Sequence, residues 1–198
     1  MKVDVVLFDL GGVVCRFLPE RRLSALARAC GVPPETVDEV LFVSGFDHLC
    51  DLGKVPVEEI LDRTRAGLGF PGGLRELQEL WCLAFDPDPA VLALAERVRP
   101  RRTGLFTDNG PLLLDAMPWA FPEVAERFDE LIFSCVIGET KPRPHAFTRA
   151  LEMLDAHPER TLFIDDSSRN VEAARELGIT AVRFEDARRL EADLAGLL

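Results

Sequence analysis

The chain has 198 residues, with 34 acidic and 23 basic side chains, a formal net charge of -11, and a hydrophobic fraction of 47%. A chain of this length and composition buries one sizeable core, so we expect a single folded domain with room for an inserted lobe. The acidic balance repels nucleic acid and anionic membranes, and no apolar run reaches the roughly 18 residues of a membrane span, so we expect a soluble protein without nucleic-acid or membrane partners.

The first predicted element is a buried strand over residues 3–9. Its residues are β-branched and apolar, and Gly11 and Gly12 follow it, as expected of a parallel strand that ends in a tight turn. Residues 19–85 then place apolar side chains at helical spacing, with breaks at Gly and Pro, and predict helices that include residues 57–68 and 74–85. No strand is expected in this segment.

The remainder of the chain alternates between helical and strand patterns. Helices are predicted over residues 90–98, 112–117, 144–154 and 170–177, and strands over residues 103–107, 131–135, 161–164 and 180–184. Such alternation predicts an α/β fold with a Rossmann-like parallel sheet core and helices on both faces, in which ligands bind at the carboxyl ends of the strands. We expect residues 1–17 and 86–198 to form this core domain and residues 18–85 to form an all-helical insert.

Polar residues collect where four of the predicted strands end. They are Asp9, the run Thr107, Asp108 and Asn109, Lys141, and the pair Asp165 and Asp166. Each type is also common in helix caps and turns, so no single one of them indicates a site. Several carboxylates at one edge of a sheet repel each other unless a cation neutralises them, and oxygen ligands suit Mg²⁺. The compact charge of a lysine suits a phosphate oxygen.

These segments resemble the four motifs of the haloacid dehalogenase-like hydrolases, in the same order along the chain. Residues 8–14 resemble the first motif, which implies that Asp9 is the nucleophile. Residues 105–110 resemble the second motif, which implies that the hydroxyl of Thr107 and the following backbone N–H hold a phosphoryl group. Residues 138–144 resemble the third motif, with Lys141 as its cation. Residues 163–170 resemble the fourth motif, with Asn170 in a supporting position.

The resemblance implies a capped phosphatase that uses Mg²⁺ and an aspartyl-phosphate on Asp9. Residues 18–85 would then be the mobile cap that closes over the site. The implied metal ligands are Asp9, the backbone carbonyl of Gly11, Asp165 and Asp166, and the implied catalytic residues are Asp9, Thr107 and Lys141. The implied substrate-binding and phosphate-binding residues are Thr107, Asp108, Asn109, Lys141 and His48.

Gly11 departs from the pattern of most phosphatases in this family. They carry a second aspartate two residues after the nucleophile, which protonates the leaving oxygen and activates water, a role worth about 10²–10⁴-fold in rate. The sequence Asp-x-Gly, with residues 45–48 and 53–55, resembles the sugar-phosphate branch typified by glucose-1-phosphate phosphatases. Either His48 or Asp47 could supply the missing proton, although both also suit an exposed loop.

Two other functions remain open at this stage. One is a 2-haloacid dehalogenase-type hydrolase, which uses the same aspartate on carbon with a cap-side arginine and aromatic residues. The other is a catalytically weak phosphate-binding or regulatory protein, in which the replacement of the usual aspartate by Gly11 would reflect a loss of turnover. We expect a small phosphorylated metabolite as partner, and a monomer or homodimer. The five scattered cysteines fit reduced thiols in a cytoplasmic protein.

Overall fold

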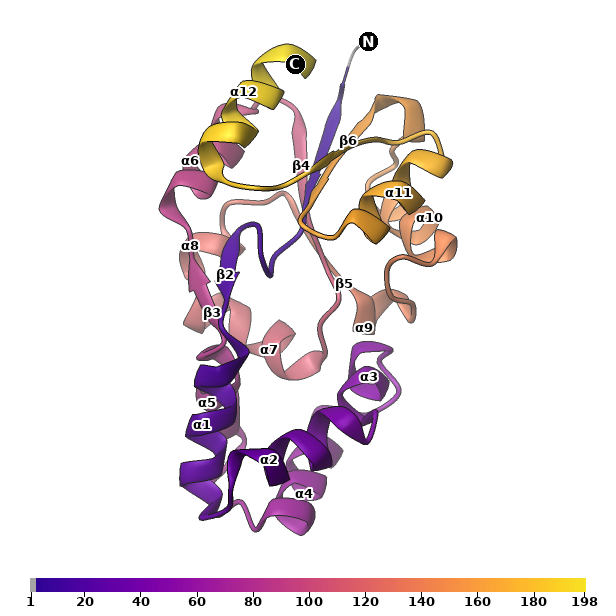
Figure 1. The fold of residues 1–198 in the computed structure, drawn as a ribbon. Helices are drawn as coiled ribbons and strands as arrows, with labels where there is room; N and C mark the ends of the chain where they lie inside the picture. The colour runs from indigo at the N-terminus through magenta and orange to yellow at the C-terminus, as the bar shows by residue number, and fades with distance from the viewer. Residues whose placement is uncertain (1–2) are drawn as a thin grey trace.

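A parallel sheet of five strands forms one half of the molecule in the computed structural model, which describes residues 3–198 (Figure 1). Residues 1 and 2, which the sequence analysis assigned to the core domain, lie outside the described residues. The strand order is β5-β4-β1-β6-β7 and every pair is parallel. The strands are β1 (Val5–Phe8), β4 (Arg102–Thr107), β5 (Glu130–Phe133), β6 (Thr161–Asp165) and β7 (Thr180–Arg183).

Helices cover both faces of this sheet, as Figure 1 shows. One face carries α6 (Pro89–Arg97), α7 (Pro111–Ala120), α8 (Pro122–Ala125) and α12 (Ala187–Leu197), and the other carries α10 (Pro144–Met153) and α11 (Ser168–Glu176). The predicted α/β fold class is therefore confirmed.

The central strand β1 explains why both faces need a cover. Its side chains alternate, so that Val6 and Phe8 join the apolar cluster beneath α6 and α7, and Val5 and Leu7 join the cluster beneath α10 and α11. All four residues are buried. A strand that is apolar on both faces is stable only between two layers of helices.

Helices make up the other half of the molecule, at the bottom of Figure 1. They are α1 (Pro19–Cys30), α2 (Pro34–Asp38), the π-helix η1 (Glu39–Val43), α3 (Phe46–Asp51), α4 (Val57–Leu68) and α5 (Leu74–Cys82). Buried side chains of these helices, including Leu26 and Leu77, belong to the same apolar cluster as Val6 and Phe8. Helix α5 packs against α7 of the sheet half. The domain boundaries proposed from the sequence stay a prediction.

A short antiparallel ribbon links the two halves. Strand β2 (Cys15–Phe17) pairs with β3 (Phe85–Pro87), so that Phe17 lies opposite Phe85 with 5.4 Å between their ring centroids. The expectation of no strand over residues 19–85 is thus wrong at its last residue, Phe85. Two strands of three residues each are too short to show an alternating pattern in the sequence.

Two further differences from the sequence prediction lie near the carboxyl end of β5 and at the end of the chain. Cys135, predicted to end a strand, lies in the short helix α9 (Ser134–Ile137), because the apolar run continues from the strand into a helical turn. Helix α12 was not predicted, although Asp186 caps it by accepting a hydrogen bond from the backbone N–H of Arg189 at 2.8 Å.

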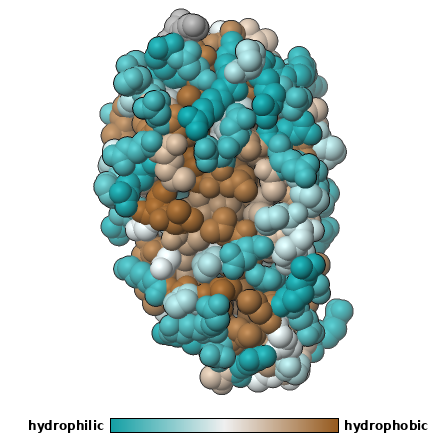
Figure 2. Space-filling model, turned by 180° about the vertical axis from the view of Figure 1, so that it is seen from behind, coloured by the Kyte–Doolittle hydropathy of each residue, from teal (hydrophilic) through white to brown (hydrophobic). Residues whose placement is uncertain are grey.

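The surface is mostly hydrophilic, but hydrophobic side chains gather across the middle of the face shown in Figure 2. This band lies at the level where the helical half meets the sheet half. Within residues 3–198, none of the helices has both the length and the apolar character that crossing a membrane requires.

The loop after α3 contacts the sheet half closely at Gly53. Its φ of +67° is in the left-handed region, and a Cβ at this position would overlap the carbonyl oxygen of Cys135 in α9. Gly69 has a similar φ of +70°, with no atom of the described chain within 4 Å of a Cβ there. A comparison of substitutions at the two glycines therefore distinguishes backbone strain, which both would suffer, from a clash between the two halves, which only Gly53 would suffer.

We expect Gly53→Ala to destabilise the protein more than Gly69→Ala. Both substitutions place alanine in the left-handed region at a cost of about 1–2 kcal/mol, and only Gly53→Ala also pushes α3 away from α9. Urea denaturation of the two variants measures the difference. Equal losses in the free energy of unfolding would show that the contact between Gly53 and Cys135 contributes nothing to the docking of α3.

Candidate active site

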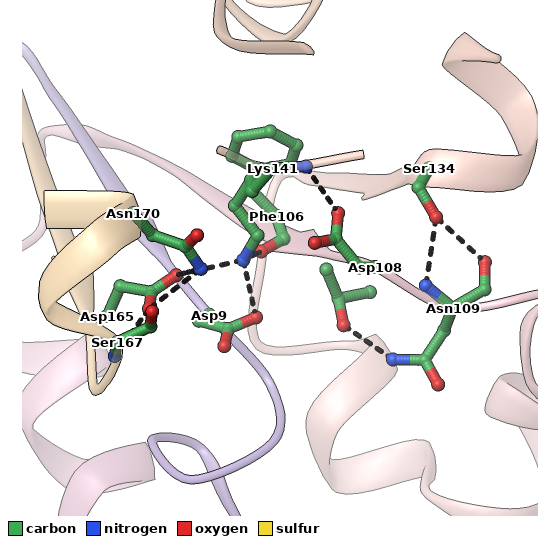
Figure 3. Close-up of polar contacts among 10 residues, drawn as sticks. Asp9, Phe106, Asp108, Asn109, Ser134, Lys141, Asp165, Ser167 and Asn170 are labelled. Atoms are coloured by element: carbon green, nitrogen blue, oxygen red, sulfur yellow. Dashed lines mark hydrogen bonds and ion pairs between the residues drawn. The ribbon is translucent and has the colours of Figure 1, made fainter. Parts of the chain in front are cut away.

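Asp9 lies directly after β1, at the carboxyl edge of the sheet, and is held by a buried lysine. Lys141 Nζ donates hydrogen bonds to Asp9 Oδ1 at 2.8 Å, to Asp165 Oδ2 at 2.9 Å and to the carbonyl oxygen of Phe106 at 3.0 Å (Figure 3). The side chain of Lys141 is 1% exposed. Its three donors are thus all used, and the two carboxylates share one cation.

Asp165 has both oxygens engaged in hydrogen bonds. The side-chain amide of Asn170 donates to Oδ1 at 3.1 Å and to Oδ2 at 3.0 Å, and the backbone N–H of Ser167 donates to Oδ1 at 2.8 Å. The residue is fully buried. Its contacts fit a residue that fixes Lys141 and reaches a metal ion through water better than one that binds the ion directly.

Asp9, Asp165 and Asp166 form the carboxylate cluster that could hold a metal ion. One ligand oxygen from each lies within 4.8 Å of the others. Gly12, with a φ of +83°, passes so close to this cluster that a Cβ there would overlap the carboxylate of Asp166. Only glycine allows the turn after β1 to approach this carboxylate so closely.

The loop after β4 presents Thr107, Asp108 and Asn109 at the same edge. Thr107 is buried, and its Oγ1 accepts a hydrogen bond from the side-chain amide of Asn109 at 2.7 Å. Asp108 Oδ1 accepts from the backbone N–H of Lys141 at 3.1 Å, and the backbone N–H of Asn109 donates to Ser134 Oγ at 3.0 Å. Figure 3 shows the loop joined to Lys141 through Asp108 and to Ser134 through Asn109.

A cavity of about 200 Å³ lies between this edge and the helical half. The sheet half, with the turn after β1 and helix α11, contributes seven of its lining residues, and β2, β3 and the helical half contribute five. The first seven are Asp9, Gly11, Thr107, Asp108, Asn109, Lys141 and Asn170, and the second group is Phe17, Arg22, Asp47, Asp51 and Phe85.

The structure thus brings most of the predicted site residues together around one cavity. Asp165 and Asp166 cluster with Asp9 without lining the cavity, and His48 does not line it either. Among residues 3–198, the lining residues include its neighbour Asp47 and not His48, which is exposed. On α3 the two side chains point in different directions, since consecutive helical residues lie about 100° apart. Of the two proton donors suggested by the sequence, Asp47 is the one that faces the cavity.

Burial sets the protonation of the central pair. It raises the pKa of Asp9 to about 7 against the opposing charge of Lys141, and the charge of Asp165 adds to the rise. Burial lowers the pKa of Lys141, but the charges of Asp9 and Asp165 more than compensate, so its pKa lies above the ordinary value. Lys141 is therefore protonated at neutral pH, and a further cation near Asp9 would favour its ionised form.

The acids of the cavity are also shifted. Burial raises the pKa of Asp51 to about 9, with Asp47 and Asp108 adding to the rise and Arg22 opposing it. Burial likewise raises the pKa values of Asp47 and Asp108. Burial lowers the pKa of Arg22 to about 10, so it stays charged at neutral pH, supported by Asp47 and Asp51.

Arg22, Asp51 and Ser134 were missed by the sequence reasoning. Arg22 lies on the same face of α1 as Leu26, four residues on, and both are buried. An arginine on the apolar face of a helix was a usable signal. Asp47 and Asp51 are also four residues apart on α3, which predicts two acids on one face.

An acidic cluster held by a buried lysine lies at the carboxyl edge of a parallel sheet, beside a cavity, and this arrangement is typical of an α/β enzyme. The chain belongs to the haloacid dehalogenase-like hydrolases, since the sequence model of that family matches residues 3–178. The resemblance inferred from the four motifs is confirmed.

Two curated relatives match this chain over nearly its full length. D-ribitol-5-phosphate phosphatase of Bacteroides thetaiotaomicron is 24% identical over 204 residues, covering 98% of this chain and 97% of that protein. Phosphatase MT3486 of Mycobacterium tuberculosis is 27% identical over 190 residues, covering 91% and 87%. By contrast, bifunctional epoxide hydrolase 2 of Rattus norvegicus is 36% identical over only 64 residues, and this match spans 12% of that protein.

Solved structures agree on the fold. The HAD family enzyme bt-2542 of Bacteroides thetaiotaomicron, in complex with magnesium and inorganic phosphate, has a TM-score of 0.82 at 24% identity, covering 95% of this chain and 98% of that one. L-2-haloacid dehalogenase of Xanthobacter autotrophicus has a TM-score of 0.64 at 17% identity, covering 98% and 83%.

We expect Asp51→Asn to stabilise the protein increasingly as the pH rises. A carboxyl whose folded pKa of about 9 exceeds its ordinary value favours folding at low pH, and this advantage is lost between about pH 4 and pH 9. Asparagine does not ionise, so the variant does not lose this stability as the pH rises. Its melting temperature should exceed that of the wild type by several degrees more at pH 8.5 than at pH 5, because each pH unit between the ordinary and the folded pKa is worth up to about 1.4 kcal/mol.

The matched control is Asp62→Asn on α4, whose carboxylate is 75% exposed. It should show no such growth with pH. Thermal unfolding followed by circular dichroism measures both variants, and a constant difference between Asp51→Asn and the wild type would contradict the buried state of Asp51.

Proposed function

We propose that this protein is a Mg²⁺-dependent phosphatase that hydrolyses a small phosphorylated metabolite, with sugar phosphates favoured, through an aspartyl-phosphate on Asp9. The observation that carries this proposal is the state of Asp9. Lys141 fixes its Oδ1, while the hydrogen bonds within residues 3–198 leave its Oδ2 without a partner, beside the cavity. A carboxylate fixed through one oxygen is positioned to attack with the other.

In the proposed reaction, Asp9 Oδ2 forms a bond to phosphorus while the bond from phosphorus to the leaving oxygen breaks. Water then hydrolyses the aspartyl-phosphate and returns Asp9 as a carboxylate. The positive charge of Lys141, the hydroxyl of Thr107 and the backbone N–H of Asp108 would bind the phosphoryl oxygens. This role is one of positioning and charge rather than of bond making.

The residues at the carboxyl edge fit a divalent cation. Asp9, Asp165 and Asp166 carry three carboxylates, which share Lys141 as the cation bonded to two of them. Asp9, Asp166 and the carbonyl of Gly11 would hold the ion directly, and Asp165 through water. Mg²⁺ prefers oxygen ligands of this kind, and when bound it neutralises charge on the transferring phosphoryl group.

The names of the full-length relatives support the choice of reaction. Both are phosphatases, and one acts on a sugar-alcohol phosphate. The cavity of about 200 Å³ suits a small metabolite rather than a drug-sized ligand. The described cysteines are all free, which supports the proposal that the protein works in a reducing compartment such as the cytoplasm.

Dehalogenation is the second candidate, because one observation favours it. Arg22 lies among the aromatic rings of Phe17, Trp81 and Phe85, which matches the cap-side arginine and aromatic residues expected for that reaction. The carboxylate of Asp166 has no use in it, since no metal is required. Chloride release from 2-chloropropionate would distinguish the two reactions.

We expect Asp9→Asn to abolish phosphate release, by more than about 10³-fold, because an amide cannot form the aspartyl-phosphate. Phosphate release from p-nitrophenyl phosphate, with Mg²⁺ and with EDTA, measures the effect. EDTA should abolish the wild-type activity, and Asp166→Ala should raise the Mg²⁺ concentration required. Asp62→Asn, on the exposed face of α4, is the control for a lost carboxylate. An Asp9→Asn enzyme with the wild-type rate would refute the assignment of the nucleophile.

Gly11→Asp tests whether the missing acid limits turnover. The nearest atoms to a Cβ at Gly11 belong to Phe17 and Phe85 at 3.7 Å, which is ordinary van der Waals contact, so the side chain has room. We expect hydrolysis of alkyl phosphates to rise by up to about 10²–10⁴-fold, with a much smaller gain for p-nitrophenyl phosphate, whose leaving group needs no proton. Gly11→Asn adds the same volume without an acid and should give no gain. If Gly11→Asp gives none either, turnover is not limited by the absence of that acid.

A further inference from the structure

One wall of the cavity carries charged side chains that the proposed reaction does not use. Arg22 of α1 and Asp47 and Asp51 of α3 face the cavity from the helical half, opposite Asp9. Phe17 and Phe85 of the ribbon complete this wall. We call Arg22, Asp47 and Asp51 the cap triad.

Arg22 is buried with an unused donor. The residue is 4% exposed, and its guanidinium carbon lies 4.1 Å from the centroid of the Trp81 ring. Its Nε donates a hydrogen bond to the carbonyl oxygen of Trp81 at 3.0 Å, whereas its second η-nitrogen is buried without a partner anywhere in residues 3–198. A buried donor without an acceptor is costly, so a ligand oxygen in the cavity would satisfy it.

The two acids of the triad, Asp47 and Asp51, also have carboxyl groups without a hydrogen-bond partner in the described part of the chain. Asp47 and Asp51 are one helical turn apart on α3, and in the described part of the chain neither carboxyl forms a hydrogen bond or an ion pair within 4 Å. Both interact with Arg22 at longer range. The wall therefore combines a buried donor without an acceptor and two carboxyls without hydrogen bonds, on three residues that line the same cavity.

Hydroxyl groups match this arrangement better than charged groups do. A hydroxyl can accept from Arg22 and at the same time donate to an ionised carboxyl of the triad or accept from a protonated one. A second anionic group on the ligand would meet the acids Asp9, Asp47, Asp51 and Asp108 around the cavity, where only Arg22 and Lys141 are cations. An ammonium group would leave the donor of Arg22 unsatisfied. The rings of Phe17 and Phe85 offer apolar surface to the C–H groups between hydroxyls.

We propose that the cap triad of Arg22, Asp47 and Asp51 is a hydroxyl-binding subsite that selects monophosphates of sugars and sugar alcohols without a second charged group. This inference rests on the proposed function, since it assigns the part of the substrate that leaves with the broken bond. It also names residues for selectivity that lie outside the four motifs.

Three esters of equal length test the subsite: a pentitol 5-phosphate, pentyl phosphate without further hydroxyls, and a pentonate 5-phosphate with a carboxylate. Calorimetry on full-length Asp9→Asn protein with Mg²⁺ measures their affinities without turnover. We expect the pentitol ester to bind about tenfold or more tightly than either of the others. Equal affinities, or a preference for the carboxylate, would overturn the proposal.

The triad residues are then changed in the same Asp9→Asn background. Arg22→Lys keeps the charge in the aromatic cage but removes the free η-nitrogen, and Asp51→Asn replaces the carboxyl group by an amide of nearly the same size. Each should reduce the preference for the pentitol ester over pentyl phosphate by about tenfold. Arg63→Gln is the control, because Arg63 lies on α4 with its side chain 52% exposed and paired with Glu59; it should keep the preference. An unchanged preference in both triad variants, with circular dichroism confirming the fold, would also overturn the proposal.

Phosphate release by the wild type is measured in parallel. If p-nitrophenyl phosphate is hydrolysed but the pentitol ester is not preferred, the subsite fails while the proposed function stands. If no ester is hydrolysed yet the pentitol ester binds preferentially, the proposed function fails while the subsite stands.

Discussion

The ion pairs of Lys141 are the interaction on which the rest of the site depends. Asp9 and Asp165 belong to two neighbouring strands, and a single ammonium group, 1% exposed, bonds to both carboxylates at 2.8 and 2.9 Å. Breaking a buried pair of this kind by removing one partner leaves an uncompensated charge, which is far more costly than losing an exposed pair. The fold thus has to bring the segment after α9 back across the ends of β4, β1 and β6, and that return also orders Asp108 through the backbone N–H of Lys141.

The sheet and the residues at its edge were predictable because the information is local. Each strand is a short apolar run followed at once by a polar residue, and parallel connections leave little choice about where those residues meet. Asp9, Thr107, Lys141 and Asp165 therefore converge as the chain order implies, and the family resemblance agrees. Cys135 shows the limit of local patterns, because an apolar run does not reveal where a strand becomes a helix. Helix α12 was missed although Asp186 is a typical N-cap residue.

The cavity wall opposite Asp9 was not predictable in the same way. Which side chains of α1 and α3 face the cavity depends on how the helices are rotated against the sheet half, and this rotation is set by packing between residues far apart in the sequence, such as α5 against α7. Arg22 and Asp51 were missed for this reason, and His48 was chosen where its neighbour Asp47 faces the cavity. The ribbon of β2 and β3 was missed because three residues carry no periodicity.

The chain passes between the two halves twice, through β2 and through β3, and these two segments are paired in the ribbon. Phe17 and Phe85 stand opposite each other in its register and also line the cavity, and Arg22 follows on the first turn and a half of α1. If the helical half rotates about this ribbon, the cap triad that would bind the alcohol moves with it. The residues that would bind the phosphoryl group remain on the sheet. Opening would then separate the alcohol, which leaves with the moving half, from the phosphorylated Asp9, which becomes exposed to the water that hydrolyses it.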